Sequence, residues 1–272
     1  MMIDCHTHIF PDRIAPKVLK QNRLELCLEP YGLCTTKDLF EYMDAAGIDY
    51  AVAFGVAPEA RLVKPTNDWL VAQSHRRLLL FGTVTPDYED WESEIDRLKA
   101  AGVVGVKFNP LYQRIVPDDR IMYPMYEKLK QERMFVYFHS GKGGNQRESS
   151  QVRATPARLR RVVDDHPGLK LICAHLGGND MLEDVLQYLV GTDVYLDTSY
   201  TPSCKVLDSV EVTNLIKRHG TDRVLYATDY PWAKQGKDHG WEYQWLLGLD
   251  LPEADKELIL GQNARRLFDL YT

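Results

Sequence analysis

The sequence has few of the features that mark secreted, membrane-spanning or nucleic-acid-binding proteins. Its five cysteines are odd in number and scattered over 272 residues, and no two form a C-x-x-C pair. This usage indicates reduced thiols rather than a disulfide framework. No apolar run approaches the roughly 20 residues of a membrane span. Asp4 stands at the fourth position with no apolar leader segment after it, so a secretory signal is not expected. We therefore expect a soluble, cytoplasmic protein.

Charge of one sign is not concentrated anywhere along the chain. The 33 Lys and Arg residues against 39 Asp and Glu residues give a formal net charge of −6, without a basic block. This distribution argues against nucleic-acid or anionic-membrane partners and favours a small-molecule substrate. No linker, repeat or low-complexity segment interrupts residues 1–272, so one domain is expected.

Short apolar runs alternate with longer amphipathic segments from end to end. The runs are rich in Val, Ile, Leu, Phe and Tyr with little polar alternation, which is typical of strands covered on both faces of a parallel sheet. The predicted strands are Met2–His6, Asp49–Phe54, Leu78–Val84, Val103–Phe108, Met134–His139, Leu169–His175, Val194–Asp197 and Arg223–Asp229.

Helix-start signals lie between these runs. Thr35 and Thr36 precede a predicted helix over Lys37–Ala46, and prolines open those over Ala157–Asp165 and Glu253–Gly261. Eight strands that each lead into a helix predict an α/β fold of the (β/α)₈ TIM-barrel type. An open doubly wound sheet would give the same alternation. The proline-containing stretch Asp12–Cys34 is expected to form an elaborated loop after the first strand.

Four of the eight histidines fall at the carboxyl ends of predicted strands, where barrels assemble their chemistry. His6 and His8 are two residues apart, so on an extended strand both imidazoles face the same side and can share one metal ion. His139 ends the fifth strand and His175 the sixth. The alternatives are a chance pair for His6 and His8 and a carbonyl-bonded core histidine for His139. The other four need no special explanation; they are His75, His166, His219 and His239.

Asp229 ends the eighth predicted strand. A carboxylate after an apolar strand is costly unless it binds a metal or hydrogen-bond donors. The alternative, a helix N-cap, is disfavoured because Pro231 interrupts the first turn.

These residues lie in motifs that follow one another in order along nearly the whole chain. Through them the chain resembles the amidohydrolase superfamily, and within it the amidohydrolase-2 branch. This branch includes aminocarboxymuconate-semialdehyde decarboxylase, resorcylate-type decarboxylases and dicarboxylate lactonases. The motifs are Ile3-Asp-Cys-His-Thr-His-Ile-Phe-Pro11, Gly105-Val-Lys-Phe-Asn-Pro110, Phe138-His-Ser-Gly141, Ala174-His-Leu-Gly-Gly178, Ala227-Thr-Asp-Tyr-Pro-Trp232 and Asn263-Ala-Arg-Arg-Leu-Phe268.

The resemblance implies one divalent metal held by His6, His8, His139 and Asp229. Zn²⁺ is the favoured ion, with Mn²⁺, Fe²⁺ or Ni²⁺ as alternatives. His175 would be a further ligand or an acid that orients the substrate, and Asp229 would also act as a base. In binuclear relatives a carboxylated lysine on the fourth strand bridges two metals. We expect Lys107 instead to be a plain cation near the substrate, with the second metal as the alternative.

Substrate selection is expected from the loops around the barrel mouth. Arg147 is a candidate anchor for a substrate carboxylate, because a guanidinium can donate two parallel hydrogen bonds to it. Tyr112, Tyr200 and Trp232 are candidate walls of the pocket. For each of these, an ordinary surface or packing role is the alternative.

The resemblance implies hydrolysis of an amide, lactone or ester of a small, carboxylated substrate by metal-activated hydroxide, with Asp229 as base. Nonoxidative decarboxylation of an aromatic or unsaturated acid is the alternative within the same branch, and a non-catalytic metal-binding barrel is a third. The chain is compact, with little room for a long lid, and this favours hydrolysis. Barrels of this kind often form homodimers, although no segment of the sequence identifies an interface.

Overall fold

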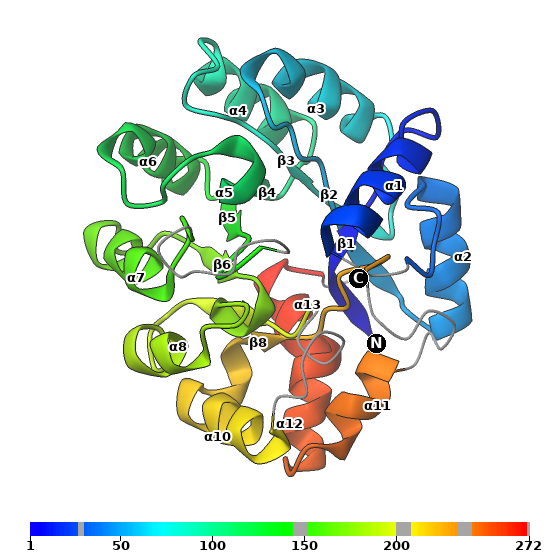
Figure 1. The fold of residues 1–272 in the computed structure, drawn as a ribbon, viewed down its shortest axis with the longest axis vertical. Helices are drawn as coiled ribbons and strands as arrows, with labels where there is room; N and C mark the ends of the chain where they lie inside the picture. The colour runs from blue at the N-terminus through cyan, green and yellow to red at the C-terminus, as the bar shows by residue number, and fades with distance from the viewer. Residues whose placement is uncertain (27–29, 144–151, 200–207, 233–240, 271–272) are drawn as a thin grey trace.

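The chain folds into a parallel β-barrel surrounded by helices (Figure 1). This structure, a computed structural model, describes residues 1–26, 30–143, 152–199, 208–232 and 241–270. Eight strands are hydrogen-bonded in sequence order, each parallel to the next. The predicted (β/α)₈ TIM barrel is confirmed. The strands are β1 (Ile3–His8), β2 (Tyr50–Phe54), β3 (Leu78–Gly82), β4 (Gly105–Phe108), β5 (Phe135–Phe138), β6 (Leu171–Cys173), β7 (Tyr195–Asp197) and β8 (Val224–Leu225).

The barrel is closed by backbone hydrogen bonds between β1 and the segment that contains β8. The amide of Cys5 donates to the Tyr226 carbonyl over 2.9 Å, and the amide of Asp229 donates to the His6 carbonyl over 3.0 Å. Thr7 and Tyr230 also form a parallel bridge. An open doubly wound sheet would leave these two edges apart, so that alternative is wrong.

The helices cover the outside of the barrel (Figure 1). The side chain of Thr35 caps α2 and that of Thr155 caps α7, so both helices begin where the sequence predicts. The predicted helix Glu253–Gly261 is instead a short α-helix, α12, that continues into a π-helical turn at Leu258–Gln262. The helices are α1 (Ala15–Leu26), α2 (Thr36–Ala46), α3 (Val63–Val71), α4 (Trp91–Ala100), α5 (Pro110–Gln113), α6 (Tyr123–Gln131), α7 (Pro156–Asp165), α8 (Leu182–Tyr188), α10 (Ser209–His219), α11 (Trp241–Gly248), α12 (Glu253–Glu257) and α13 (Asn263–Leu267).

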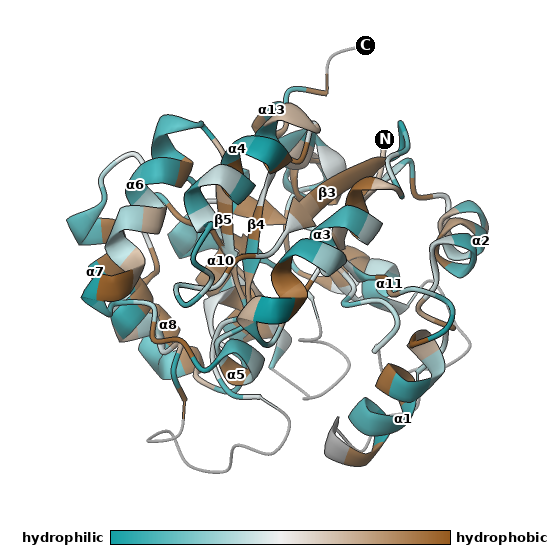
Figure 2. Cartoon of the chain, turned by 90° about the horizontal axis from the view of Figure 1, so that it is seen from above, coloured by the Kyte–Doolittle hydropathy of each residue, from teal (hydrophilic) through white to brown (hydrophobic). Residues whose placement is uncertain are grey.

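The stretch after β1 contains a helix that the sequence does not predict. Pro16 lies in the first turn of α1, where the missing N–H costs no hydrogen bond, so this proline starts the helix rather than breaking it. Figure 2 shows α1 and α5 on the same side of the barrel, away from the chain termini. The expected elaborated loop is therefore a helical wall on this side.

Apolar side chains fill the interior of the barrel and leave its carboxyl end polar. The interior cluster includes Ile3, Val52, Phe54 and Phe81, all with no exposed surface. A second, larger cluster packs the outer faces of the strands against the helices. Two layers of this kind hold the strands rigidly, so side chains at the strand ends have fixed positions.

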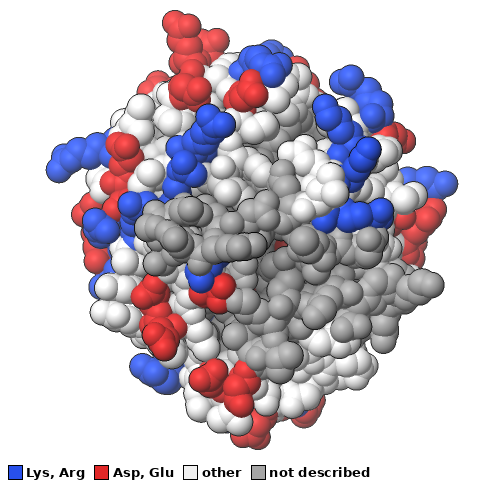
Figure 3. Space-filling view, in the orientation of Figure 1, with Lys and Arg blue, Asp and Glu red and all other residues white. Residues whose placement is uncertain are grey.

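Among the described helices, none combines the length and the apolar character that crossing a lipid bilayer requires. On the face drawn in Figure 3, positive and negative side chains alternate around the rim, and neither sign forms a continuous field among the residues described.

Candidate metal centre

Two histidines of β1 and an aspartate from the segment after β8 bring their polar atoms together at the carboxyl end of the barrel. The Nε2 atoms of His6 and His8 lie 3.2 Å apart. Oδ1 of Asp229 lies 3.2 Å from His6 Nε2 and 3.0 Å from His8 Nε2. His6 is 1% exposed and Asp229 is 7% exposed, so this cluster is shielded from bulk water.

The carboxylate beside His6 favours one tautomer of this imidazole. His6 Nδ1 donates to Oδ2 of Asp197 over 2.7 Å. In the neutral imidazole this leaves Nε2 without a proton, so its lone pair is available as an acceptor or a metal ligand. Burial and the charge of Lys107 lower the pKa of His6 to about 3, so this imidazole is neutral. Burial opposes ionisation of Asp229, but the facing imidazoles of His6 and His8 lower its pKa to about 2. The lone pair of His6 Nε2 thus faces Oδ1 of the ionised Asp229.

This donor set fits a divalent cation. Two acceptors at 3.2 Å repel each other unless positive charge lies between them. Ligand atoms about 2.1 Å from a metal and at right angles are about 3.0 Å apart, close to the spacings in this cluster. His175 extends the group, since its ligand atom and those of His6 and Asp229 lie within 4.8 Å of one another.

His139 contacts this group through His175. Its Nδ1 lies 3.0 Å from Nε2 of His175, while its Nε2 is buried without a hydrogen-bond partner among the described residues. Burial lowers the pKa of both imidazoles, so both are neutral and able to bind a metal. His139 and His175 therefore form a second pair of nitrogen donors beside the first cluster.

The backbone at two of these residues adopts the left-handed conformation. The φ angle is 60° at His175 and 65° at Asp229, a region in which side chains other than glycine are rare. Such conformations persist only where the surrounding structure imposes them, and they concentrate at functional sites.

Asp197 and Ser199, which the sequence does not single out as site residues, connect the two histidine clusters. Oδ1 of Asp197 accepts hydrogen bonds from the backbone amide of His175 and from the Ser199 hydroxyl. Oδ2 accepts from His6 Nδ1 and from the Tyr137 hydroxyl. The sequence feature that could have identified Asp197 is a carboxylate at the end of an apolar strand, which is also the feature that identified Asp229. Burial opposes ionisation of Asp197, but His6 and these donors lower its pKa. Asp197 thus holds His6 and the backbone of His175 in place.

We expect Asp197→Asn to lower the affinity for a divalent ion by about 10- to 100-fold, because a partner carboxylate orients the imidazole and raises its basicity. Competition with a metal-binding dye measures this affinity. Asp193→Asn makes the same chemical change at an exposed position before β7 and is the control. Equal affinities for both variants would contradict the role given to Asp197.

Lys107 is buried on β4 and reaches toward the same site. Its Nζ lies 4.3 Å from the ring centroid of Phe54 and 4.5 Å from that of Tyr137. No hydrogen-bond partner for Nζ is found among the described residues. Burial lowers the pKa of Lys107 to about 8, so the side chain is mostly charged at neutral pH.

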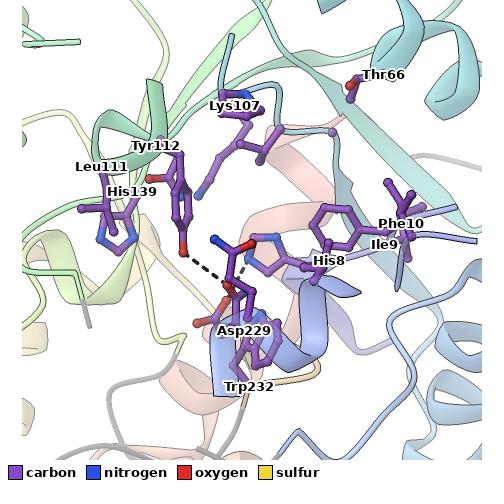
Figure 4. A pocket seen from close by; sticks show the side chains of 18 of the residues that line it. His8, Ile9, Phe10, Thr66, Lys107, Leu111, Tyr112, His139, Asp229 and Trp232 are labelled. Carbon is purple, nitrogen blue, oxygen red and sulfur yellow. Dashed lines mark hydrogen bonds and ion pairs between the residues drawn. The ribbon is translucent and has the colours of Figure 1, made fainter. Parts of the chain in front are cut away.

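These groups open into a cavity of about 510 Å³ at the barrel mouth. Figure 4 shows His8, Lys107 and Asp229 pointing into one space, with Tyr112 and Trp232 around it. The structure therefore brings these two predicted wall residues to the cavity. Arg147 and Tyr200 lie outside the described residues. Other walls are largely apolar and include Ile9, Phe10, Ile14, Val18, Leu62, Trp69 and Leu111.

The sequence profile of the amidohydrolase family matches residues 3–270. No curated protein matches the chain by sequence. Solved structures with the same fold include 5-carboxyvanillate decarboxylase from Sphingomonas paucimobilis, at 18% identity and a TM-score of 0.73, with 98% of each chain covered. The 2,6-dihydroxybenzoate decarboxylase from Rhizobium shows 20% identity and a TM-score of 0.71, covering 99% of this chain and 98% of that enzyme.

A third solved structure contains a metal. It is the dihydroxybenzoic acid decarboxylase from Polaromonas sp. JS666 with bound manganese and the inhibitor 2-nitroresorcinol. It shows 19% identity and a TM-score of 0.71, covering 99% of this chain and 97% of that one.

Proposed function

Because the chain belongs to the amidohydrolase family, we propose that it is a metal-dependent, nonoxidative decarboxylase of hydroxylated aromatic acids. The decarboxylases that share its fold support this reaction over the hydrolysis favoured from the sequence.

The observation that carries the proposal is a buried positive charge, Lys107, in a cavity whose other walls are largely apolar. Lys107 provides a buried cation without a protein counterpart at hydrogen-bond distance among the described residues. Phe10, Leu111 and Trp232 line the same cavity. A planar aromatic acid matches both features, because its ring packs against the walls and its carboxylate meets the cation. A neutral ester or amide would leave the ammonium group unpaired.

We propose that His6, His8 and Asp229 hold one divalent ion, with His139 and His175 beside it. The manganese in the Polaromonas enzyme supports Mn²⁺ alongside the Zn²⁺ favoured from the sequence. When bound, such an ion supplies positive charge that polarises substrate oxygens. The neutral imidazole of His6 and the ionised carboxylate of Asp229 are in the protonation states that metal binding requires.

Asp229 is the residue we propose to move the proton. The contacts of its side chain with His6 and His8 both use Oδ1, and the carboxylate is ionised at neutral pH. It takes the proton of a substrate hydroxyl and delivers it to the ring carbon that bears the carboxylate. The bond between that carbon and the carboxylate then breaks, its electron pair stays with the ring, and carbon dioxide leaves. Solvent returns the proton to the phenolate oxygen. The proton and the electron pair both balance.

The direct test is a carbon dioxide assay of the metal-loaded protein with hydroxybenzoates, beside a panel of lactones, esters and amides. We expect carbon dioxide from at least one ortho-hydroxylated acid. Turnover confined to the lactones, esters or amides would contradict decarboxylation and restore the hydrolase assignment. Absence of any turnover would favour a non-catalytic metal-binding barrel.

We expect Lys107→Met to raise KM for an anionic aromatic acid by roughly 10- to 100-fold, because a hydrogen bond to a charged group is lost. In the unaltered protein, affinity for the anion should fall as pH rises through about 8, where Lys107 loses its proton. Steady-state kinetics measure both. Lys142→Met is the matched control, since Lys142 lines the same cavity but pairs with Asp180 over 3.1 Å. An equal change in KM for the two variants would contradict the role of Lys107.

A further inference from the structure

Strand β1 contains an irregularity where the histidine pair begins. Its register against β2 shifts between Asp4 and Thr7. Cys5 belongs to the apolar cluster inside the barrel, and the ring of His6 lies 4.7 Å from that of Phe54 in the same cluster. Successive residues of a regular strand face opposite sides, so two successive inward side chains require such an irregularity. It therefore turns the histidine pair toward the cavity.

The side chain of Asp4 spans this irregularity. Its Oδ1 accepts a hydrogen bond from the backbone amide of His6 over 3.1 Å. A bond from an aspartate side chain to the amide two residues ahead forms a local turn, which fixes the backbone between the two residues. Asp4 thus holds the backbone at the point where the register of β1 shifts.

The same carboxyl group also binds the segment that carries Asp229. Oδ1 of Asp4 accepts from the backbone amide of Thr228 over 3.1 Å, and Oδ2 accepts from the Thr228 hydroxyl over 2.6 Å. That hydroxyl accepts in turn from the backbone amide of Tyr230 over 3.1 Å. The residues on both sides of Asp229 are therefore fixed. Its left-handed backbone, with φ of 65°, is a conformation that persists only where the surrounding structure imposes it.

Closure of the barrel alone does not account for a carboxyl group at this position. Asp4 and Thr228 have no exposed surface, and burying a carboxyl group is costly unless donors surround it. A further donor is the Tyr42 hydroxyl of α2, which lies 3.4 Å from Oδ2. Backbone bonds such as that from Cys5 to Tyr226 already close the barrel here. What the carboxyl group adds is a direct connection between the two segments that carry the metal donors.

We propose that Asp4 is a positioning residue of the metal centre. Through the His6 amide it maintains the irregularity of β1 that turns the histidine pair into the cavity. Through Thr228 it holds Asp229 opposite that pair. Asp4 lies outside the set of described residues that line the cavity, so it acts through the backbone of the donors. The inference rests on the proposed metal site and is independent of whether the reaction is decarboxylation or hydrolysis.

Titration of the metal-free, full-length protein with Co²⁺ tests this role, because the visible absorption of bound Co²⁺ reports the geometry of its ligands. We expect Asp4→Ala to lower the affinity for Co²⁺ about tenfold, as loss of a residue that orients metal ligands does, and to shift the absorption bands. Thr228→Val keeps the shape of the side chain but removes the hydroxyl. It should have the same effects, and it provides the test should Asp4→Ala fail to fold. Asp4→Asn should retain most of the affinity, because its side-chain oxygen can still accept from both backbone amides.

Glu94→Ala is the matched control, because Glu94 is also a buried carboxylate and accepts from Asn67 and Arg97 outside the cavity. It should lower Tm and leave the affinity and the absorption bands unchanged. Unchanged affinity and bands in Asp4→Ala and Thr228→Val would overturn the positioning role, and so would an equal change in Glu94→Ala. Failure of the unaltered protein to bind Co²⁺ would overturn the metal centre and this role together. The expected changes in a protein that releases no carbon dioxide would support the role and contradict only the proposed decarboxylation.

Discussion

Asp229→Asn is expected to lower carbon dioxide release by about 10²- to 10⁴-fold, the usual contribution of a positioned acid or base. An asparagine at this position has nearly the same shape but cannot take up and deliver the proton. It also weakens one of the three donors of the tight cluster, whose atoms lie 3.0–3.2 Å apart. Initial rates at saturating substrate and metal measure the effect.

Metal content must accompany that measurement, because loss of the ion would also abolish turnover. Assays with excess metal and elemental analysis of the variant separate the two causes. Asp12→Asn, the same change at an exposed residue after β1, is the control. A metal-loaded Asp229→Asn protein that retained normal turnover would exclude Asp229 as the proton carrier.

Removing the divalent ion with a chelator is expected to abolish activity and to lower the thermal unfolding temperature. An ion present at a thousand times its Kd stabilises the fold by about 4 kcal/mol. For a chain of this length, that corresponds to roughly 10 °C in Tm. Without the ion, the lone pair of the buried, neutral His6 faces the buried carboxylate of Asp229, so loss of the ion destabilises the barrel. Differential scanning calorimetry with and without added Mn²⁺ or Zn²⁺ measures the shift.

His8→Ala provides the matched variant for the calorimetry. It removes one donor of the cluster and should greatly reduce the rise in Tm on adding metal. His75→Ala, which removes an exposed histidine outside the cavity, should keep the full rise. A metal-dependent rise of equal size in both variants would show that the ion binds elsewhere.

The fold could be predicted because a buried parallel strand leaves a distinct pattern. Seven of the eight predicted apolar runs contain a whole strand of the barrel, and the first overlaps β1. Four of the paired segments, β3, β5, β6 and β8, end earlier than predicted, whereas β1 extends two residues further, to His8. Predicted strands include His139, His175 and Asp229, yet all three lie just beyond β5, β6 and β8. At these positions the backbone leaves the sheet and turns its side chains to the cavity, which hydropathy does not register.

The role of Asp197 at the site could not be predicted, because it depends on contacts between distant parts of the chain. His6 and Asp197 are 191 positions apart, so no local pattern joins them. β7 is a short strand with a weak signal, and its terminal carboxylate is recognised as part of the site only once the barrel is closed. Helix α1 was missed because prolines on either side indicate a loop, whereas Pro16 begins the helix.

The reaction type could not be read from the ligands, because hydrolysis and decarboxylation in this branch use the same set. We propose that the cavity separates them, in particular Lys107 on β4, whose Nζ has no hydrogen-bond partner among the described residues. Lys107 stands in the motif Gly105-Val-Lys-Phe-Asn-Pro110, but its lack of a partner there is a property of packing.

The central claim is most directly tested by magnetic resonance of a carboxyl-labelled substrate. The metal-loaded protein is mixed in deuterated water with ortho-hydroxylated benzoates that carry carbon-13 in the carboxylate. Decarboxylation with Asp229 as proton carrier predicts labelled carbon dioxide or bicarbonate, together with a phenol carrying deuterium at the vacated ring carbon. Asp229→Asn should show neither product at a comparable rate. Intact labelled acid throughout the series, with lactones or esters cleaved by the same preparation, would contradict the account.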